Sequence, residues 1–302
     1  MRKERLMGRF GVFFVLSLVM TGACKGGVVT GPSPISDVTI VTLRSALDGS
    51  PVSGAVVQAG GQEVVADSSG SAAVPGLVRG SVMKITAGGF VVRDTKYSGS
   101  GVPLLLWPDL PGLIESVYSS INGYLIRWGN SDDNFRPEAL LYVHEELWED
   151  SVWQALEEAV NTANAAPTQA RVRLVKEKPS PDLAFYDVML DPTIDPTYAA
   201  ATTGNRADRY GINGGTIRFR KKIYAANVAI ILHELGHAVG GFGWHNPAAV
   251  GIMRTSYTPG LRDYTDLEKD MMRLVSARST GNVRPDSDVI NPFWSGAVVS
   301  YH

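Results

Sequence analysis

The chain has 302 residues, of which 44% are apolar, so it is long enough to form two domains with cores of their own. Its 28 Lys and Arg residues nearly balance its 30 Asp and Glu residues, and the formal net charge is −2. This balance and the lack of a basic run argue against nucleic acid as a partner. The 32 glycines and 17 prolines predict many turns, as in β-rich structure.

The first 23 residues have the layout of a secretory signal peptide. Basic residues precede an apolar run from Phe10 to Met20, which is too short to cross a bilayer comfortably. The only cysteine of the sequence, Cys24, directly follows the small residues Thr21, Gly22 and Ala23. This segment resembles the lipobox of bacterial lipoproteins, in which the cysteine is acylated. Ordinary signal cleavage beside an incidental cysteine is the alternative.

The lipobox resemblance implies an extracytoplasmic protein that is anchored through a lipid on Cys24 to a membrane of the bacterial cell envelope. Lys25 follows the cysteine in place of Asp, which by the sorting rule of Gram-negative lipoproteins favours the outer membrane. Residues 24–36 are rich in Gly, Pro and Ser and are expected to form a tether. A single cysteine allows no internal disulfide, so stability depends on the cores and any bound metal.

Residues 37–107 contain short β-type runs between turn signals, which predict a small all-β sandwich. The expected strands are residues 38–43, 54–58, 63–66, 81–86 and 90–93. Turn sequences such as Asp48-Gly49, Asp67-Ser68-Ser69-Gly70 and Gly88-Gly89 separate them. This succession resembles the carboxypeptidase regulatory-like β-sandwich. The region holds no catalytic cluster, and we expect it to space or dock the rest of the protein.

Prolines within residues 103–114 indicate a link to a second domain over residues 115–302. In that domain we expect both strands and helices. The expected strands are residues 139–144, 171–175, 183–190 and 216–220, and the expected helices are residues 150–165 and 265–277. The predicted fold class is therefore multidomain, with an all-β sandwich followed by an α+β domain.

Three of the five histidines fall within the thirteen residues from His233 to His245. The run His233-Glu234-Leu235-Gly236-His237 has the H-E-x-x-H form of a helical zinc site. Side chains four residues apart share one face of a helix, so His233 and His237 can bind one ion. Glu234 lies beside the first ligand, where its carboxylate can hold a water molecule near the metal.

Residues at both ends of this predicted helix are typical of helix termini. Asn227 is a suitable N-cap, and Gly240-Gly241 can take the left-handed conformation that ends a helix. A turn at these glycines would bring His245 back to the ion as a third ligand. Glu268 is the alternative third ligand, as in thermolysin-like enzymes. A purely structural zinc is a further alternative, although such sites usually close with four protein ligands.

The histidine run resembles the zinc site of the metzincin proteases, and within them the matrixin-like branch, whose usual form is H-E-x-x-H-x-x-G-x-x-H. Gly243 occupies the position of the third ligand and His245 follows two residues later, which predicts a loop lengthened by two residues. Met253 lies eight residues after His245, as the methionine turn does in matrixins. The resemblance covers roughly residues 124–278 and implies a twisted mixed sheet with an active-site helix.

The metzincin resemblance implies a zinc-dependent endopeptidase that acts on extracytoplasmic proteins or peptides. One catalytic Zn²⁺ would be held by His233, His237 and His245, with Glu234 as general base and Met253 as a floor beneath the metal. The alternative is a surface binding lipoprotein that holds zinc and has little or no proteolytic activity.

The same resemblance suggests where the substrate would lie. Tyr257 is a candidate for the specificity pocket or the oxyanion site, with simple packing as its alternative. The substrate would lie as an added strand beside an edge strand, for which residues 198–202 are our candidate. The acidic stretches 131–134 and 191–195 could bind Ca²⁺, but solvated loops are the simpler interpretation and calcium is not supported.

Overall fold

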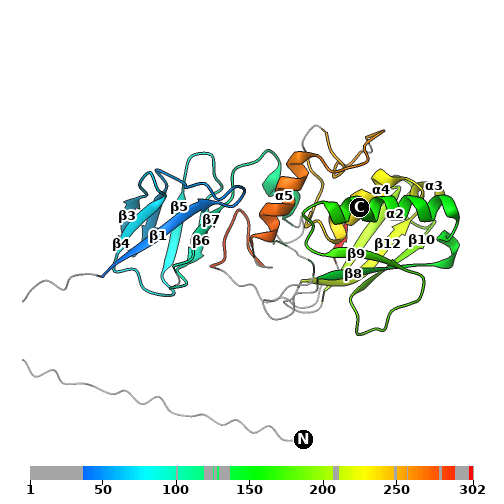
Figure 1. The fold of residues 1–302 in the computed structure, drawn as a ribbon, viewed down its shortest axis with the longest axis horizontal. Helices are drawn as coiled ribbons and strands as arrows, with labels where there is room; N and C mark the ends of the chain where they lie inside the picture. The colour runs from blue at the N-terminus through cyan, green and yellow to red at the C-terminus, as the bar shows by residue number, and fades with distance from the viewer. Residues whose placement is uncertain are drawn as a thin grey trace, which may run out of the picture. The chain divides into compact units, whose positions relative to one another are not determined.

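The computed structural model describes residues 37–99, 101–118, 125, 128, 137–206, 211–247, 250–256, 258–278, 281–289 and 299–301. These residues form a mixed α/β protein with three sheets (Figure 1). No helix in this part of the chain is long and apolar enough to span a bilayer. The predicted signal peptide, Cys24, Tyr257 and the acidic stretch 131–134 lie outside the described residues.

Residues 38–106 form two small sheets. One contains β1 (Val38–Ser45), β4 (Ser71–Pro75) and β7 (Leu104–Leu106) in the order β4-β1-β7. The other contains β2 (Val56–Ala59), β3 (Gln62–Val65), β5 (Val82–Thr86) and β6 (Arg93–Lys96) in the order β3-β2-β5-β6. Alternate residues of both sheets, such as Leu43, Val57 and Ile85, are buried in a common apolar core.

Three of the sequence expectations for this region were wrong. β4 was missed because its alanines have low strand propensity, and β7 was missed because it lies among the prolines that we took for a link. β7 instead pairs in parallel with β1. The strand expected at residues 90–93 begins only at Arg93, because Phe90 follows a turn at Gly89 and bridges to Pro108.

The largest sheet lies in the second half of the chain. Its strands follow the order β13-β11-β12-β10-β8-β9. Their bounds are β8 (Glu138–Val143), β9 (Arg171–Val175), β10 (Phe185–Leu190), β11 (Ala200–Arg206), β12 (Ile212–Phe219) and β13 (Val299–Tyr301). β8, β9, β10 and β12 are parallel, whereas β11 runs antiparallel to both β12 and β13. The sheet is therefore mixed, as the metzincin resemblance implied.

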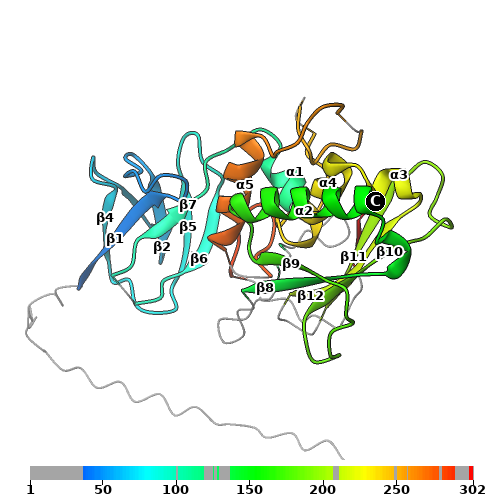
Figure 2. The same ribbon diagram turned by 45° about the vertical axis from the view of Figure 1, so that its right-hand side comes forward.

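The described residues also form five α-helices and one 3₁₀ turn, some of which pack against this sheet (Figure 2). Their bounds are α1 (Leu113–Val117), η1 (Glu145–Leu147, a 3₁₀ turn), α2 (Asp150–Ala165), α3 (Lys222–Ala225), α4 (Val228–Ala238) and α5 (Asp266–Ser276). α2 contacts β9, α4 contacts β11, and the two helices pack against each other. α2 has the predicted bounds because Val152, Leu156 and Ala159 recur on one side and are buried.

The candidate edge strand at residues 198–202 is only partly an edge. β11 begins at Ala200, and β13 pairs with its residues Thr202 to Gly204. The sequence could not indicate this pairing, because β13 follows almost a hundred residues later in the chain. Ala200 and Ala201 precede the stretch that pairs with β13, so among the described residues the start of β11 has no strand on that side.

Candidate metal centre

Helix α4 positions the first two histidines. Its N-cap is Asn227, as predicted, and the Asn227 side chain accepts hydrogen bonds from the amides of Ala229 and Ile230 at 3.0 and 3.3 Å. Most of its apolar residues are buried, which holds the helix in the core. The helix ends at Ala238, and Gly241 takes the expected left-handed conformation with a φ of 83°.

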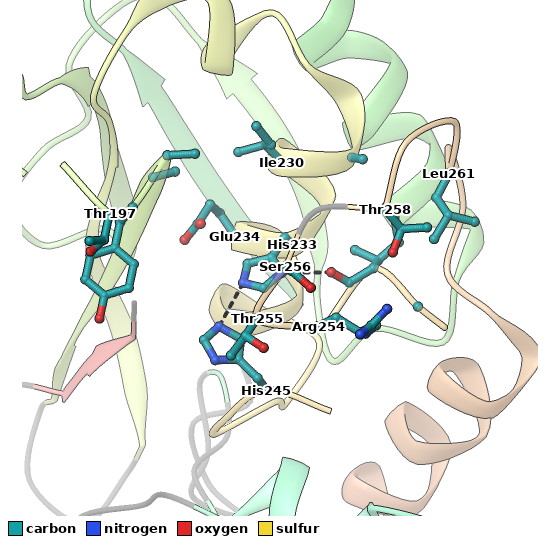
Figure 3. Close-up of a pocket in the computed structure, with 16 residues that line it drawn as sticks. Thr197, Ile230, His233, Glu234, His245, Arg254, Thr255, Ser256, Thr258 and Leu261 are labelled. Atoms are coloured by element: carbon teal, nitrogen blue, oxygen red, sulfur yellow. Dashed lines mark hydrogen bonds between the residues drawn. The ribbon is translucent and has the colours of Figure 1, made fainter. Parts of the chain in front are cut away.

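The structure brings His233, His237 and His245 together (Figure 3). One potential ligand atom from each ring lies within 4.8 Å of the others, and the Nε2 atoms of His233 and His245 are 3.1 Å apart. Two nitrogen ligands of a tetrahedral zinc ion, at about 2.0–2.1 Å from it, lie about 3.3 Å apart. The cluster can therefore hold one metal ion. Within the described residues no fourth His, Cys, Asp or Glu joins this group.

Backbone carbonyls orient two of the three rings. The Nδ1 atom of His233 lies 2.8 Å from the carbonyl oxygen of Ile252, and Nδ1 of His237 lies 3.0 Å from that of Phe242. A carbonyl can only accept, so each Nδ1 carries the hydrogen and each Nε2 presents its lone pair to the centre of the cluster. Burial lowers the pKa of His233, which favours the neutral ring that metal binding requires.

Glu234 lies beside the histidines, with its carboxylate almost fully buried. Thr202 of β11 donates a hydrogen bond from Oγ1 to Oε2 of Glu234 at 2.6 Å. Burial raises the pKa of Glu234 to about 8, and the bond from Thr202 opposes this shift. Thr202 was not singled out from the sequence as a partner of Glu234, because a threonine in a strand carries no signal for a contact 32 residues away.

Met253 packs against the helix that carries His233 and His237. Its side chain is fully buried, and a Cβ atom built on Gly236 would lie only 2.1 Å from the Met253 sulfur. Gly236 stands between the two histidines of α4, so the absence of a side chain there lets Met253 approach the helix. The backbone of Met253 is also fixed, since its carbonyl oxygen accepts a hydrogen bond from the Asn246 amide at 2.6 Å.

Glu268 holds the backbone of Met253 and is not one of the clustered ligands. Its Oε1 atom accepts a hydrogen bond from the Met253 amide at 2.6 Å. Its Oε2 atom bonds Thr265, with which Glu268 forms the capping box of α5. Both carboxylate oxygens of Glu268 therefore accept hydrogen bonds from groups other than the histidines. The alternative that Glu268 is the third metal ligand, as in thermolysin-like enzymes, has no support in the structure.

Gly236→Ala should destabilise the protein, although Gly→Ala in a helix normally stabilises it by up to about 1 kcal/mol. The added methyl group would displace the Met253 sulfur, and overpacking of this kind costs about 1–3 kcal/mol. Urea unfolding would measure the change in free energy. A Gly236→Ala variant at least as stable as the wild type would show that Met253 does not pack against this helix.

A cavity of about 340 Å³ opens beside the histidines. Figure 3 shows Thr197 on one side of it and Thr258 and Leu261 on the other, with His233 and Glu234 between them. Its walls come from the segment before and into β11, from α4, from His245, and from residues within 251–256 and 258–261. Two of the clustered histidines, His233 and His245, thus line a cavity that lies between β11 and the segment after Met253.

The other acidic and histidine candidates lie away from this centre. Nε2 of His144 is 3.1 Å from a carboxylate oxygen of Asp187, outside the metal group. The carboxylate of Asp191, in the predicted acidic stretch 191–195, accepts hydrogen bonds from Thr193 and forms an ion pair with Arg218 at 3.0 Å. These protein donors lower the pKa of Asp191 and occupy the oxygens that a calcium ion would need.

Comparison with known proteins gives no family for this chain. No model of a known protein family matches it, and no curated protein shows a significant match. The function therefore has to be argued from the site itself. That site consists of three clustered imidazoles, a buried carboxylate held by a threonine, and an open cavity beside them.

Proposed function

We propose that the protein is a zinc-dependent endopeptidase of metzincin type that hydrolyses peptide bonds of extracytoplasmic proteins or peptides. The observation that carries this proposal is the convergence of His233, His237 and His245 on one point, with Glu234 beside them in a cavity. A set of three imidazoles suits zinc better than magnesium or calcium, which prefer oxygen ligands. Catalytic zinc sites combine three protein ligands with an open position, whereas structural sites are usually closed by a fourth.

The arrangement of the elements supports the metzincin resemblance. The sheet is mixed, with β11 as its antiparallel member, and the helix with the H-E-x-x-H run follows β12 in the chain after the short helix α3. Met253 packs below that helix, as the methionine turn of the family would. The lengthened loop before His245 still returns this ring to within 3.1 Å of His233.

A bound zinc ion would lower the pKa of a water molecule and polarise the peptide carbonyl. Glu234 would accept the proton of that water and pass it to the leaving amine. Thr202 fixes Oε2 of Glu234, which orients the carboxylate so that Oε1 can take part in proton transfer. Burial raises the pKa of Glu234, and the positive charge of a bound zinc ion would oppose this shift and favour the carboxylate that a base requires.

The start of β11 is the proposed site for the substrate backbone. Ala200 lines the cavity, and Ala200 and Ala201 lie before the part of β11 that pairs with β13. An extended peptide could add to the sheet at this point and pass in front of the histidines. In the cell, we place this site outside the cytoplasm, on a protein anchored through Cys24 to a membrane, in the outer membrane if the cell is Gram-negative.

Digestion of a peptide library by the full chain, followed by mass spectrometry, tests this proposal. We expect cleavage by the zinc-loaded protein, loss of cleavage after the metal is removed by a chelator, and recovery with Zn²⁺ but not with Ca²⁺. Unchanged cleavage after metal removal would contradict the zinc mechanism. A protein that carries stoichiometric zinc and cleaves nothing would favour the alternative of a zinc-holding binding lipoprotein.

A further inference from the structure

The loop that carries His245 is held from both sides by backbone hydrogen bonds. The Asn246 amide donates to the carbonyl oxygen of Met253 at 2.6 Å. The Trp244 amide donates to the carbonyl oxygen of Ser116 at 2.9 Å. The first partner belongs to the methionine turn, but the second belongs to α1, the short helix that links the β-sandwich to the rest of the chain. One of the two backbone supports of the third histidine therefore comes from the linker.

A close contact at Gly112 reinforces this support. Gly112 precedes α1 and has a φ of 74°, a conformation that favours glycine. A Cβ atom built there would lie 2.8 Å from Oδ1 of Asn246 and 3.0 Å from the Pro247 ring. Ser116 closes the turn, because its amide and hydroxyl both bond the Gly112 carbonyl oxygen, at 3.0 and 2.5 Å. The linker thus fits tightly against the residues that follow His245.

Helix α1 is in turn fixed by buried contacts. Its residues Leu113, Ser116 and Val117 have no exposed surface. The next residue, Tyr118, donates a hydrogen bond to the side chain of Asn282, and its ring lies 6.2 Å from that of Trp107 at the end of the sandwich. Residues 37–302 accordingly form one compact unit. The linker is therefore fixed by packing within the fold, and a change in its conformation would shift the loop that carries His245.

We propose that the linker segment Gly112–Ser116 is a positioning element of the metal site, which holds His245 in place for the metal. The inference rests on the metal site of the proposed function but not on peptide hydrolysis. It assigns a role to residues that lie outside the region covered by the metzincin resemblance. It also gives the β-sandwich a function within the chain, because the sandwich anchors the linker on its other side.

The test is the zinc affinity of Gly112→Ala in the full chain, measured by competition with a chromogenic chelator. We expect affinity to fall about 10-fold or more, in the range found when a partner of a metal ligand is lost. Gly76→Ala is the matched control, because Gly76 also has a positive φ of 65° but no atom within 4 Å of the added methyl group. This control should bind zinc as the wild type does.

A double-mutant cycle with His245→Ala separates positioning from general destabilisation. If Gly112 acts through His245, adding Gly112→Ala to His245→Ala should change zinc affinity by less than about twofold. Cobalt substitution gives a second readout, since the absorption spectrum of Gly112→Ala with Co²⁺ should shift towards that of His245→Ala. An equal loss of affinity in both backgrounds, or no loss in Gly112→Ala, would overturn the inference.

Ser116→Ala provides a milder variant if Gly112→Ala does not fold. It removes the Ser116 hydroxyl bond to the Gly112 carbonyl without adding an atom, and should weaken zinc binding by at least about twofold, again only when His245 is present. Unchanged affinity in this folded variant would count against the inference. A wild-type protein that binds no zinc would defeat both this inference and the proposed function, whereas a zinc-binding wild type with an unaffected Gly112→Ala would defeat the inference alone.

Discussion

Glu234→Ala should lower peptide hydrolysis by about 10²–10⁴-fold, the contribution of a well-placed general base. Glu234 is the only carboxylate among the described residues that line the cavity, so no neighbour can replace it there. Its side chain is not one of the three clustered ligands, and zinc content should therefore stay at the wild-type level. Turnover of a peptide found in the library digest, measured beside zinc content by mass spectrometry, would test both parts.

Two further variants give this prediction its controls. Glu157→Ala removes a carboxylate from the exposed side of α2 and should leave turnover unchanged. Thr202→Val removes the hydrogen bond that orients Glu234, a loss of about 1 kcal/mol or more, and should reduce turnover several-fold with zinc retained. Equal turnover by Glu234→Ala and the wild type would exclude Glu234 as the base.

Asp286→Ala should destabilise the protein by about 3–5 kcal/mol, the cost of leaving a buried charge without its partner. The Asp286 carboxylate is fully buried and forms ion pairs with Arg93 at 2.7 Å and with Arg278 at 2.7 Å. Arg93 belongs to β6 of the sandwich, whereas Arg278 follows α5. Removing Asp286 would take away the carboxylate that the buried guanidinium group of Arg278 pairs with, whereas Arg93 would keep its ion pair with Asp288.

The free energy of unfolding from urea titration would measure this loss. Glu138→Ala is the matched control, because it breaks the exposed ion pair with Arg173 and should cost no more than about 1 kcal/mol. A loss for Asp286→Ala as small as that of the control would show that the sandwich is not held by this cluster. Two separate unfolding transitions in the wild type would lead to the same conclusion.

The metal cluster could be predicted from the sequence because its determinants are local. His233 and His237 share a helix face by their spacing, and the glycines after the helix allow the return of His245. The bounds of α2 and β9 were also predicted correctly, since both depend on periodic patterns within one segment. Met253 was placed by a spacing of eight residues, and the structure puts its sulfur beneath the helix.

The parts that the sequence did not reveal depend on contacts between distant segments. The bond from Thr202 to Glu234 spans 32 residues, and that from Arg93 to Asp286 spans 193. The carbonyl groups that orient His233 and His237 could not be predicted from residue types, because every residue has a backbone carbonyl. The support of His245 by the linker depends in the same way on a backbone bond between Trp244 and Ser116.

The zinc content of the purified full chain, wild type beside His245→Ala, tests the central claim most directly. Our account predicts one zinc ion per wild-type chain, held by His233, His237 and His245, and loss of that ion from the variant when both proteins are dialysed against the same weak chelator. Equal zinc retention by the two proteins would show that His245 does not bind the metal, and would contradict the proposed catalytic centre.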